Sequence, residues 1–474
     1  MQQLSNMDTS FLSLESQRTP MHIGCIWTFS APKTGKMTFP RFKRHVISRL
    51  PISPVFRRRL SSLPMNIDLP YWVEDRNFDI DNHLQHIQLR GKDAEEQKRT
   101  LSNQFFSQTL DQAKPLWAMT FIDCSDDESG QFSVLLKFHH SAVDGKSAEK
   151  ILSGLLSDDQ DSVDPLQDSW HPETLSITRM VGNKLRSIYR APKELSALTQ
   201  SLSHSVLNSA QLRHRDKQQQ PPHFFMSPHS PFNEEIDTAR HLSSAHLSLS
   251  TIKDIKKAYA GSTVNDVVLT ICAGALRKHL LKQGELPVSP MVAMVPVSKR
   301  EGDEQDQGNL ISPMLVSLAT NIGSPLARLE AVHQNALKAK EYNREVAVEK
   351  IINHLPSWSS AWVTKAYTYF RVANHIKPVF NLIITNVPGP SCPLYLDGAE
   401  LVSMEGMAPI VDGMGLTLVI TSYRDTLTVS VTSTSDMAAH SPFFIKYLHE
   451  ALEELQHAVL PDKGKTPSNS QATA

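Results

Sequence analysis

The sequence of 474 residues has few of the features that mark a disulfide-rich, metal-binding or membrane-spanning protein. Its four cysteines are far apart, and no CxxC pair occurs, which argues against a zinc knuckle and against a disulfide framework. We therefore expect reduced, mostly buried thiols in a cytosolic protein. The longest apolar runs, such as 267–276, are near ten residues, whereas a membrane-spanning helix needs ~20.

The sequence also has no excess of one charge. The 48 basic and 49 acidic residues leave a net charge of −1, so no overall field favours a nucleic acid or an acidic partner. Residues 1–16 are polar throughout and have no basic segment, which argues against a signal peptide. The expected location is cytoplasmic, and any contact with a membrane is expected to be peripheral.

Several catalytic and structural signatures are missing as well. The sequence has no GxSxG elbow for a serine nucleophile, no HExxH zinc motif and no short-period repeat. If the protein is an enzyme that uses a base, a substrate hydroxyl or amine is therefore expected to attack directly.

The length and the order of patterns predict two αβ regions, because 474 residues exceed one ordinary core. We place a first domain at 1–155, a connection at 156–240, a second domain at 241–460 and a disordered tail at 461–474. Alternation and helical periodicity predict the following elements of the first domain: strands at 22–31, 116–123 and 132–140, with helices at 39–50, 93–110 and 146–156. Those of the second are strands at 245–250 and 379–390, a hairpin at 416–433, and helices at 262–284 and 441–456.

The stretch KFHHSAVDGKSAEK, at 137–150, contains the strongest candidate for chemistry. Strand alternation places His140 on the face that also carries four apolar residues, while the opposite face is more polar; the four are Phe132, Val134, Leu136 and Phe138. A histidine at the end of a buried face is partly desolvated and can remain neutral at pH 7, as a general base must. A hydrogen-bonded core histidine fits the same pattern, so the residues alone leave both interpretations open.

The neighbours of His140 help to sort the other interpretations. A Walker A motif ending in GKS would need glycine where His140 stands. His140 and Asp144 have the spacing of two metal ligands, but Gly145 disfavours a continuous helix and no second ligand cluster occurs, so we expect no metal. Asp144 is expected to cap the following helix or to anchor the loop, and Gly145 to permit a turn or a close approach of a ligand. His139 is expected to be a structural neighbour.

The motif HHxxxDG at 139–145 is the hallmark of the CoA-dependent acyltransferase superfamily. With the other motifs, the sequence resembles the bacterial bifunctional wax ester synthase/acyl-CoA:diacylglycerol acyltransferase family. These motifs occur in order: MDTSFLSLESQRTPMHIG at 7–24, KPLW at 114–117, TVNDVVL at 263–269, PVSKR at 296–300, GNLISPMLVSL at 308–318 and TNVPGP at 385–390. The DFGWG motif of plant alcohol acyltransferases is missing, and VDGMGL at 411–416 stands in its place.

This resemblance implies a fold of the α/β (α+β) class, with two chloramphenicol-acetyltransferase-like domains, each a mixed sheet with flanking helices, and a substrate tunnel between them. It implies transfer of a fatty acyl group from acyl-CoA to a long-chain alcohol or to diacylglycerol. His140 matches the catalytic base of the family and Asp144 its structural aspartate. Acyl-CoA is then a substrate, and no further cofactor is implied.

Two other groups of residues are candidates near the substrates. Asn265 and Asp266 open a helix, where a polar pair is ordinarily a cap, while the resemblance places them near the active site, with Asn265 as a donor to an oxyanion. Ser298, Lys299 and Arg300 follow a strand and can contact CoA phosphates, although exposed charges at a strand end explain them equally well.

Three remaining expectations concern lipid, membrane and partners. Segment 355–370 combines small and aromatic residues and suits either an alkyl-chain tunnel or a core helix. A basic amphipathic helix at 176–193 can rest on an anionic membrane or a lipid inclusion, or pack on the two domains. The alternative function is a condensation-like module that joins carrier-bound substrates, which we disfavour because no carrier domain adjoins it in this sequence.

Overall fold

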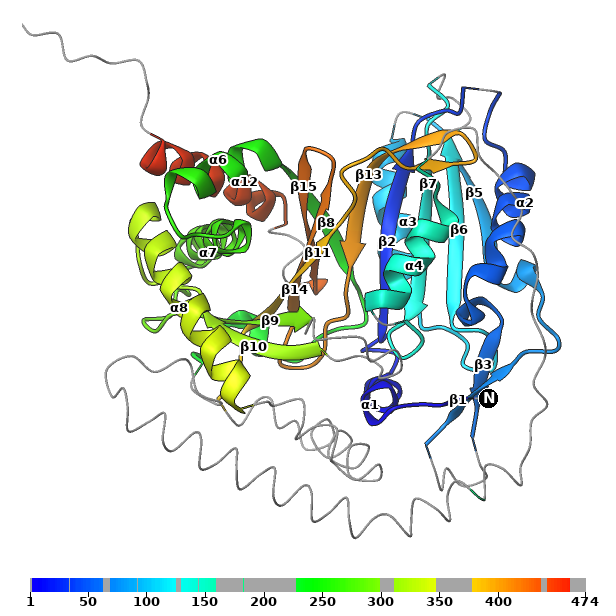
Figure 1. The fold of residues 1–474 in the computed structure, drawn as a ribbon, viewed down its shortest axis with the longest axis horizontal. Helices are drawn as coiled ribbons and strands as arrows, with labels where there is room; N and C mark the ends of the chain where they lie inside the picture. The colour runs from blue at the N-terminus through cyan, green and yellow to red at the C-terminus, as the bar shows by residue number, and fades with distance from the viewer. Residues whose placement is uncertain are drawn as a thin grey trace, which may run out of the picture.

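The computed structural model describes residues 2–33, 35–62, 69–91, 93–124, 129–143, 145–158, 182, 227–298, 311–346, 377–435 and 441–460. In these ranges the chain forms two sheets of six strands each, a small sheet of three strands, and helices that cover the large sheets (Figure 1). The described residues contain no helix that is long and apolar enough to cross a membrane. The predicted segments 176–193 and 355–370 and the tail lie outside the described residues, apart from residue 182.

The first large sheet holds the strand that leads to the twin histidines. Its pairs are antiparallel, except that β5 and β6 run parallel. The strand order is β12 (Tyr395–Leu396), β13 (Ala399–Met407), β2 (His22–Phe29), β7 (Phe132–His139), β6 (Trp117–Cys124) and β5 (Leu84–Leu89). β12 and β13 come from the predicted second domain, yet they complete the first sheet, so sheet membership does not follow the predicted boundary there.

Helices cover both faces of this sheet. Helices α2 (Phe39–Arg49) and α4 (Gly145–Leu155) pack with the even-numbered residues of β7, from Phe132 to Phe138, in one core. Helix α3 (Ala94–Ser107) packs Phe106 on the other face, beside Leu135. Figure 1 shows α4 in front of the sheet and α3 on its far side. The phase predicted for β7 is confirmed.

The opposite face of β7 is polar as predicted, but it is not exposed. Its side chains Ser133, Lys137 and His139 are 4%, 3% and 0% exposed. α3 approaches so closely that a Cβ added at Gly24 of the neighbouring strand would lie 2.5 Å from Phe106 Cε1. Three polar residues are thereby enclosed beneath a helix, where each must find a partner inside the protein.

The second large sheet forms the core of the other half of the molecule. Its order is β10 (Ile311–Ser317), β9 (Val292–Ser298), β11 (Leu382–Pro388), β14 (Leu416–Tyr423), β15 (Thr426–Ser433) and β8 (His241–Ser248). The side of this sheet away from the first half carries α6 (Leu249–Ala258), α7 (Val264–Gln283), α8 (Pro325–Val346) and α12 (Ser441–Val459) (Figure 1). The predicted hairpin is confirmed and turns at Arg424, which has a φ of 54°.

The start and the end of helix α7 are set by local sequence signals. Thr263 caps its start by accepting a hydrogen bond from the backbone of Asp266, and the Asp266 carboxylate accepts one from the backbone of Thr263. Gly284 ends the helix in the left-handed region, with a φ of 75°, which glycine adopts without strain. The helix is buried on all sides from Asp266 to Leu276, where its sequence is mostly apolar, and its last turns are partly exposed.

Smaller elements lie at the edge of the first half. Helix α1 (Asn6–Leu14) follows β1, and β1 belongs to the small sheet. The other short elements are β1 (Gln2–Gln3), β3 (Arg58–Ser61), β4 (Tyr71–Glu74), and 3-10 helices η1 (Leu50–Ile52), η2 (Pro54–Phe56), η4 (Ile80–Asn82) and η5 (Pro231–Asn233).

Strand β13 joins the two halves directly. It is hydrogen-bonded to β2 of the first sheet, and it also faces β14 and β15 of the second (Figure 1). The Gly406 amide donates to Ser430 Oγ at 3.1 Å, and Thr421 Oγ1 donates to the Met404 carbonyl at 3.1 Å. An added Cβ at Gly406 would lie 2.5 Å from Val419, so glycine permits this close approach.

Candidate active site

The chain turns sharply at the twin histidines. β7 ends at His139, whose amide donates to the Leu116 carbonyl at 3.0 Å. The His140 amide donates to the Met21 carbonyl at 2.8 Å, and the Ala142 amide donates to the His139 carbonyl at 2.9 Å. Both histidines are therefore fixed through their backbone to segments on either side of β7.

The ring of His139 is locked in one tautomer. Its Nδ1 accepts a hydrogen bond from the Ser141 amide at 3.1 Å, and Ser141 Oγ lies 2.7 Å from the same atom. Because a backbone amide can only donate, Nδ1 carries no proton, and the neutral ring carries its proton on Nε2. That nitrogen lies 3.4 Å from Glu15 Oε1, so His139 faces a carboxylate.

Glu15 is a functional candidate that the sequence did not single out. It caps the end of α1, and its carboxylate is 5% exposed. Oε1 accepts from the Met21 amide at 3.4 Å, and Oε2 accepts from Gln112 Nε2 at 2.7 Å. Burial alone would raise the pKa of Glu15, but the contacts with His139, Gln112 and Met21 outweigh it and lower this pKa. The carboxylate is therefore charged, although its side chain is almost fully buried.

His140 itself is stacked on the side chain of Phe11. The two ring centroids are 4.1 Å apart and the planes differ by 14°. The residue keeps some exposed surface, but its Nδ1 is buried and has no hydrogen-bond partner within the described part of the chain. Burial lowers the pKa of His140 from its ordinary value of 6.5 to about 4. The imidazole is thus neutral at pH 7, as the sequence predicted.

The other residues of the motif are only partly described. Gly145 is the first residue of α4, one position before the predicted start. Asp144 lies outside the described residues, so its capping or anchoring role stays a prediction. The described residues contain no group of three His, Cys, Asp or Glu side chains that could hold a metal ion.

Asn265 and Asp266 lie in the first turn of α7. The Asp266 carboxylate accepts from the Thr263 amide at 2.8 Å and lies 2.9 Å from His333 Nδ1. Its contacts favour the cap rather than the catalytic interpretation. Asn265 is half-buried, and its role at an oxyanion stays a prediction. Ser298 ends β9, whereas Lys299 and Arg300 lie outside the described residues, so CoA binding there is likewise untested.

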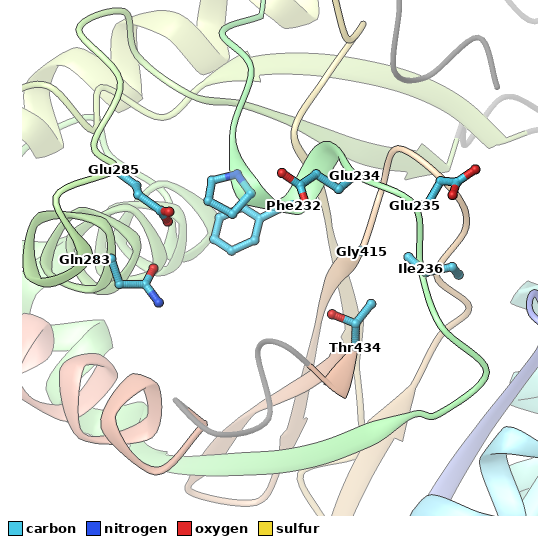
Figure 2. A pocket seen from close by; sticks show the side chains of 9 residues that line it. Phe232, Glu234, Glu235, Ile236, Gln283, Glu285, Gly415 and Thr434 are labelled. Carbon is cyan, nitrogen blue, oxygen red and sulfur yellow. The ribbon is translucent and has the colours of Figure 1, made fainter.

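His140 lines neither of two hollows that lie among the described residues. The smaller, of ≈ 170 Å³, has Gln283 and Glu285 from the end of α7 on one side and Thr434 on the other (Figure 2). Three carboxylates line this smaller hollow, those of Glu234, Glu235 and Glu285, and they would repel the phosphates of CoA. The larger, of ≈ 760 Å³, lies between α3 and 238–242, where the two halves meet.

Comparison with known proteins identifies the family. Residues 4–268 match the wax ester synthase/diacylglycerol acyltransferase catalytic domain, and 307–456 match the C-terminal domain of the same family. An O-acyltransferase WSD of Acinetobacter baylyi is 30% identical over 463 residues, covering 96% of both chains. A probable diacylglycerol O-acyltransferase of Mycobacterium tuberculosis is 30% identical over 454 residues, covering 95% of this chain and 98% of that one.

Solved structures agree with this assignment. The wax ester synthase/diacylglycerol acyltransferase of Marinobacter aquaeolei matches with a TM-score of 0.69 and 27% identity, over 97% of this chain and 100% of that one. A starter condensation domain of rhizomide synthetase matches with a TM-score of 0.57 at 12% identity, over 98% of this chain and 96% of that one, which is a likeness of fold alone. The paired αβ halves, the HHxxxDG turn at the end of β7 and these matches lead to one conclusion: the chain belongs to the wax ester synthase/diacylglycerol acyltransferase family, a family of O-acyltransferases.

Proposed function

We propose that this enzyme transfers a fatty acyl group from acyl-CoA to the hydroxyl of a long-chain alcohol or of diacylglycerol, with His140 as general base. The observation that carries the proposal is the environment of His140. Its ring is neutral because burial lowers its pKa to about 4, and it stands at the end of a central strand of the first sheet. A neutral imidazole can accept a proton, which a protonated one cannot.

The reaction follows from that assignment. His140 takes the proton of the acceptor hydroxyl as its oxygen attacks the thioester carbon of acyl-CoA. The tetrahedral intermediate carries a negative charge on the former carbonyl oxygen. When it collapses, the carbon–sulfur bond breaks, and His140 returns its proton to the departing CoA sulfur. One ester and one thiol form, and no bond to the enzyme is made.

The low pKa of His140 means that protonating its ring during the reaction costs free energy. Relative to an ordinary histidine, the imidazolium is disfavoured by about 3 kcal/mol, because each pKa unit corresponds to roughly 1.4 kcal/mol. The site must offset this cost when the proton is transferred. In our proposal Asp144 is the structural aspartate of the motif and positions His140 for this step.

The remaining parts of the proposal rest on the resemblance. The two substrates enter a tunnel between the halves from opposite sides. Ser298, Lys299 and Arg300 contact CoA phosphates, and Asn265 donates to the oxyanion. The enzyme works in the cytoplasm at the surface of a membrane or lipid inclusion. The larger hollow also lies at the junction of the halves, although His140 does not line it.

The test measures thiol release and ester formation from palmitoyl-CoA with hexadecanol or dipalmitoylglycerol. General-base catalysis contributes typically 10²–10⁴-fold, so His140→Gln should lower kcat by about that factor and leave the circular dichroism spectrum unchanged. The matched control is His86→Gln, a surface histidine of β5 whose Nε2 lies 3.2 Å from Asp123. Undiminished activity in His140→Gln would exclude His140 as the base. Turnover with carrier-bound amines, and none with either hydroxyl acceptor, would favour the condensation-like alternative.

A further inference from the structure

Helix α1 contacts the twin histidines from two positions, four residues apart. Phe11, in its last turn, stacks on the ring of His140. Glu15, at its C-cap, lies against His139 and the amide of Met21. Residues four apart share one face of a helix, so α1 presents both side chains to the turn together.

We propose that Phe11 and Glu15 are positioning residues for His140: Phe11 covers one face of the ring and holds it in one plane, and Glu15 fixes the backbone that carries it. This proposal rests on the proposed role of His140 as the base. Neither residue is required to touch the reacting atoms.

Glu15 acts on both neighbours of the His140 backbone. Its carboxylate accepts from the Met21 amide, and the Met21 carbonyl accepts from the His140 amide at 2.8 Å. The same carboxylate faces His139 Nε2, on the residue just before His140. Gln112 donates to the second oxygen and restrains the carboxylate from the far side. Without the carboxylate, the amide of Met21 would lose its acceptor, and Nε2 of His139 would lose the charge that faces it at 3.4 Å.

Phe11 acts on the ring itself. A parallel stack with centroids 4.1 Å apart covers one face of the imidazole and excludes water from it. Burial is the main cause of the low pKa of His140, so uncovering this face should raise that pKa toward 6.5. Among the described residues, the ionisable groups around the turn include His139, Glu15, Lys137 and Arg58, whose Nη2 donates to the Ala142 carbonyl. Of these, His139 contributes to the lowering.

The experiment for Phe11 needs no substrate. The rate at which diethyl pyrocarbonate modifies His140, followed by peptide mass mapping against pH, reports the pKa of its ring. In the native enzyme the midpoint should lie near 4, and in Phe11→Ala it should move up toward 6.5, while Phe11→Leu should stay closer to the native value. The matched control is Phe39→Ala, which removes a similar stack on His86, with centroids 5.1 Å apart. Identical midpoints in native enzyme and Phe11→Ala would refute the role of Phe11.

The experiment for Glu15 separates positioning from simple stability. Glu15→Ala should lower kcat by about 10–100-fold with little change in KM for either substrate, because a misplaced base slows the chemical step. Glu15→Gln should recover most of kcat, since its amide oxygen still accepts from Met21 and the amide of Gln112 can flip to match it. The control, Glu400→Ala, removes a surface partner of Arg424. A Glu15→Ala enzyme that only melts at a lower temperature, with native kcat, would refute the role of Glu15.

The two levels of the proposal fail in different ways. If His140→Gln retains activity, the proposed general base is wrong, whatever Phe11 and Glu15 do. If His140→Gln is inactive while both Phe11→Ala and Glu15→Ala keep the native midpoint and native kcat, the base stands and the positioning role of α1 falls.

Discussion

Lys137 offers a sharp test of how the first half is held together. Its ammonium lies beneath α3, 3% exposed, and donates to the carbonyls of Phe105 and Gln108 at 2.5 and 2.6 Å. These carbonyls belong to the last turn and C-cap of α3, which have no partner within the helix. The nitrogen also lies 4.5 Å from the ring centre of Phe105. Burial lowers the pKa of Lys137 from 10.5 to about 7, against an opposing contribution from Glu15.

The sign of the pH effect follows from this pKa. Between pH 7 and 10.5 the unfolded chain holds a proton on this lysine that the folded chain has released, so stability rises with pH. For pKa values of about 7 when folded and 10.5 when unfolded, the gain between pH 7 and pH 9 is about 2 kcal/mol. The change in the free energy of unfolding between pH 7 and pH 9 tests the low pKa of Lys137, whereas the free energy at a single pH does not. Replacing the lysine removes two hydrogen bonds, but it also removes the cost of burying a charge.

The assay is urea unfolding at pH 7 and pH 9 of native enzyme and Lys137→Met, followed by tryptophan fluorescence and circular dichroism. The free energy of unfolding of native enzyme should gain about 2 kcal/mol over that of the variant between the two pH values. The control is Lys278→Met: burial would lower the pKa of Lys278, but ion pairs with Glu450 and Glu454 outweigh it and raise this pKa, so its contribution should be constant over this range. Parallel curves for native enzyme and Lys137→Met would refute the reasoning.

Two further predictions concern single positions. Gly24→Ala should lower the free energy of unfolding by roughly 1–3 kcal/mol, because its Cβ would lie 2.4 Å from the Leu136 carbonyl oxygen; a thermal melt checks this, and an unchanged melting temperature would contradict it. Asp266→Ala should cost about 1–3 kcal/mol by removing the cap of α7 and the partner of His333. Asp266→Asn should recover part of that stability, and an Asp266→Ala enzyme that is fully stable but inactive would instead place Asp266 in catalysis.

Elements that depend on neighbours in sequence were predicted well. The phase of β7 follows from alternation, and the bounds of α7 follow from Thr263 and from Gly284. β8 begins at His241, earlier than the predicted 245, because its first residues are polar and are held by pairing with β15. Features set by a few neighbouring residues, such as strand phase and helix caps, can be predicted from the sequence. Strand ends that depend on pairing with a distant strand cannot.

Helices α6 and α8 were not predicted, and other departures come from contact between distant segments. β13 pairs with β2, matching Gly406 with Cys25, although its composition resembles that of any other strand. The sequence shows only that the other side of β7 is more polar, and the position of α3 shows that Ser133 and Lys137 are buried there. Hydropathy describes the cost of burying a side chain, and it cannot tell which helix supplies the partners that offset this cost.

The same reasoning explains how much of the candidate site could be predicted. Strand phase identifies His140 and predicts that its ring is partly desolvated, but a histidine at a strand end has no low pKa of its own. That pKa follows from burial of the ring, and Phe11 of α1, far from β7 in the sequence, stacks on one face of this ring. Glu15 lies in a quoted motif, yet its polar neighbours resemble those of any surface helix end, and only the fold shows that its carboxylate is buried against His139. The proposed base is therefore complete only after α1 has docked against β7, so loss of that docking should abolish catalysis before it unfolds either sheet.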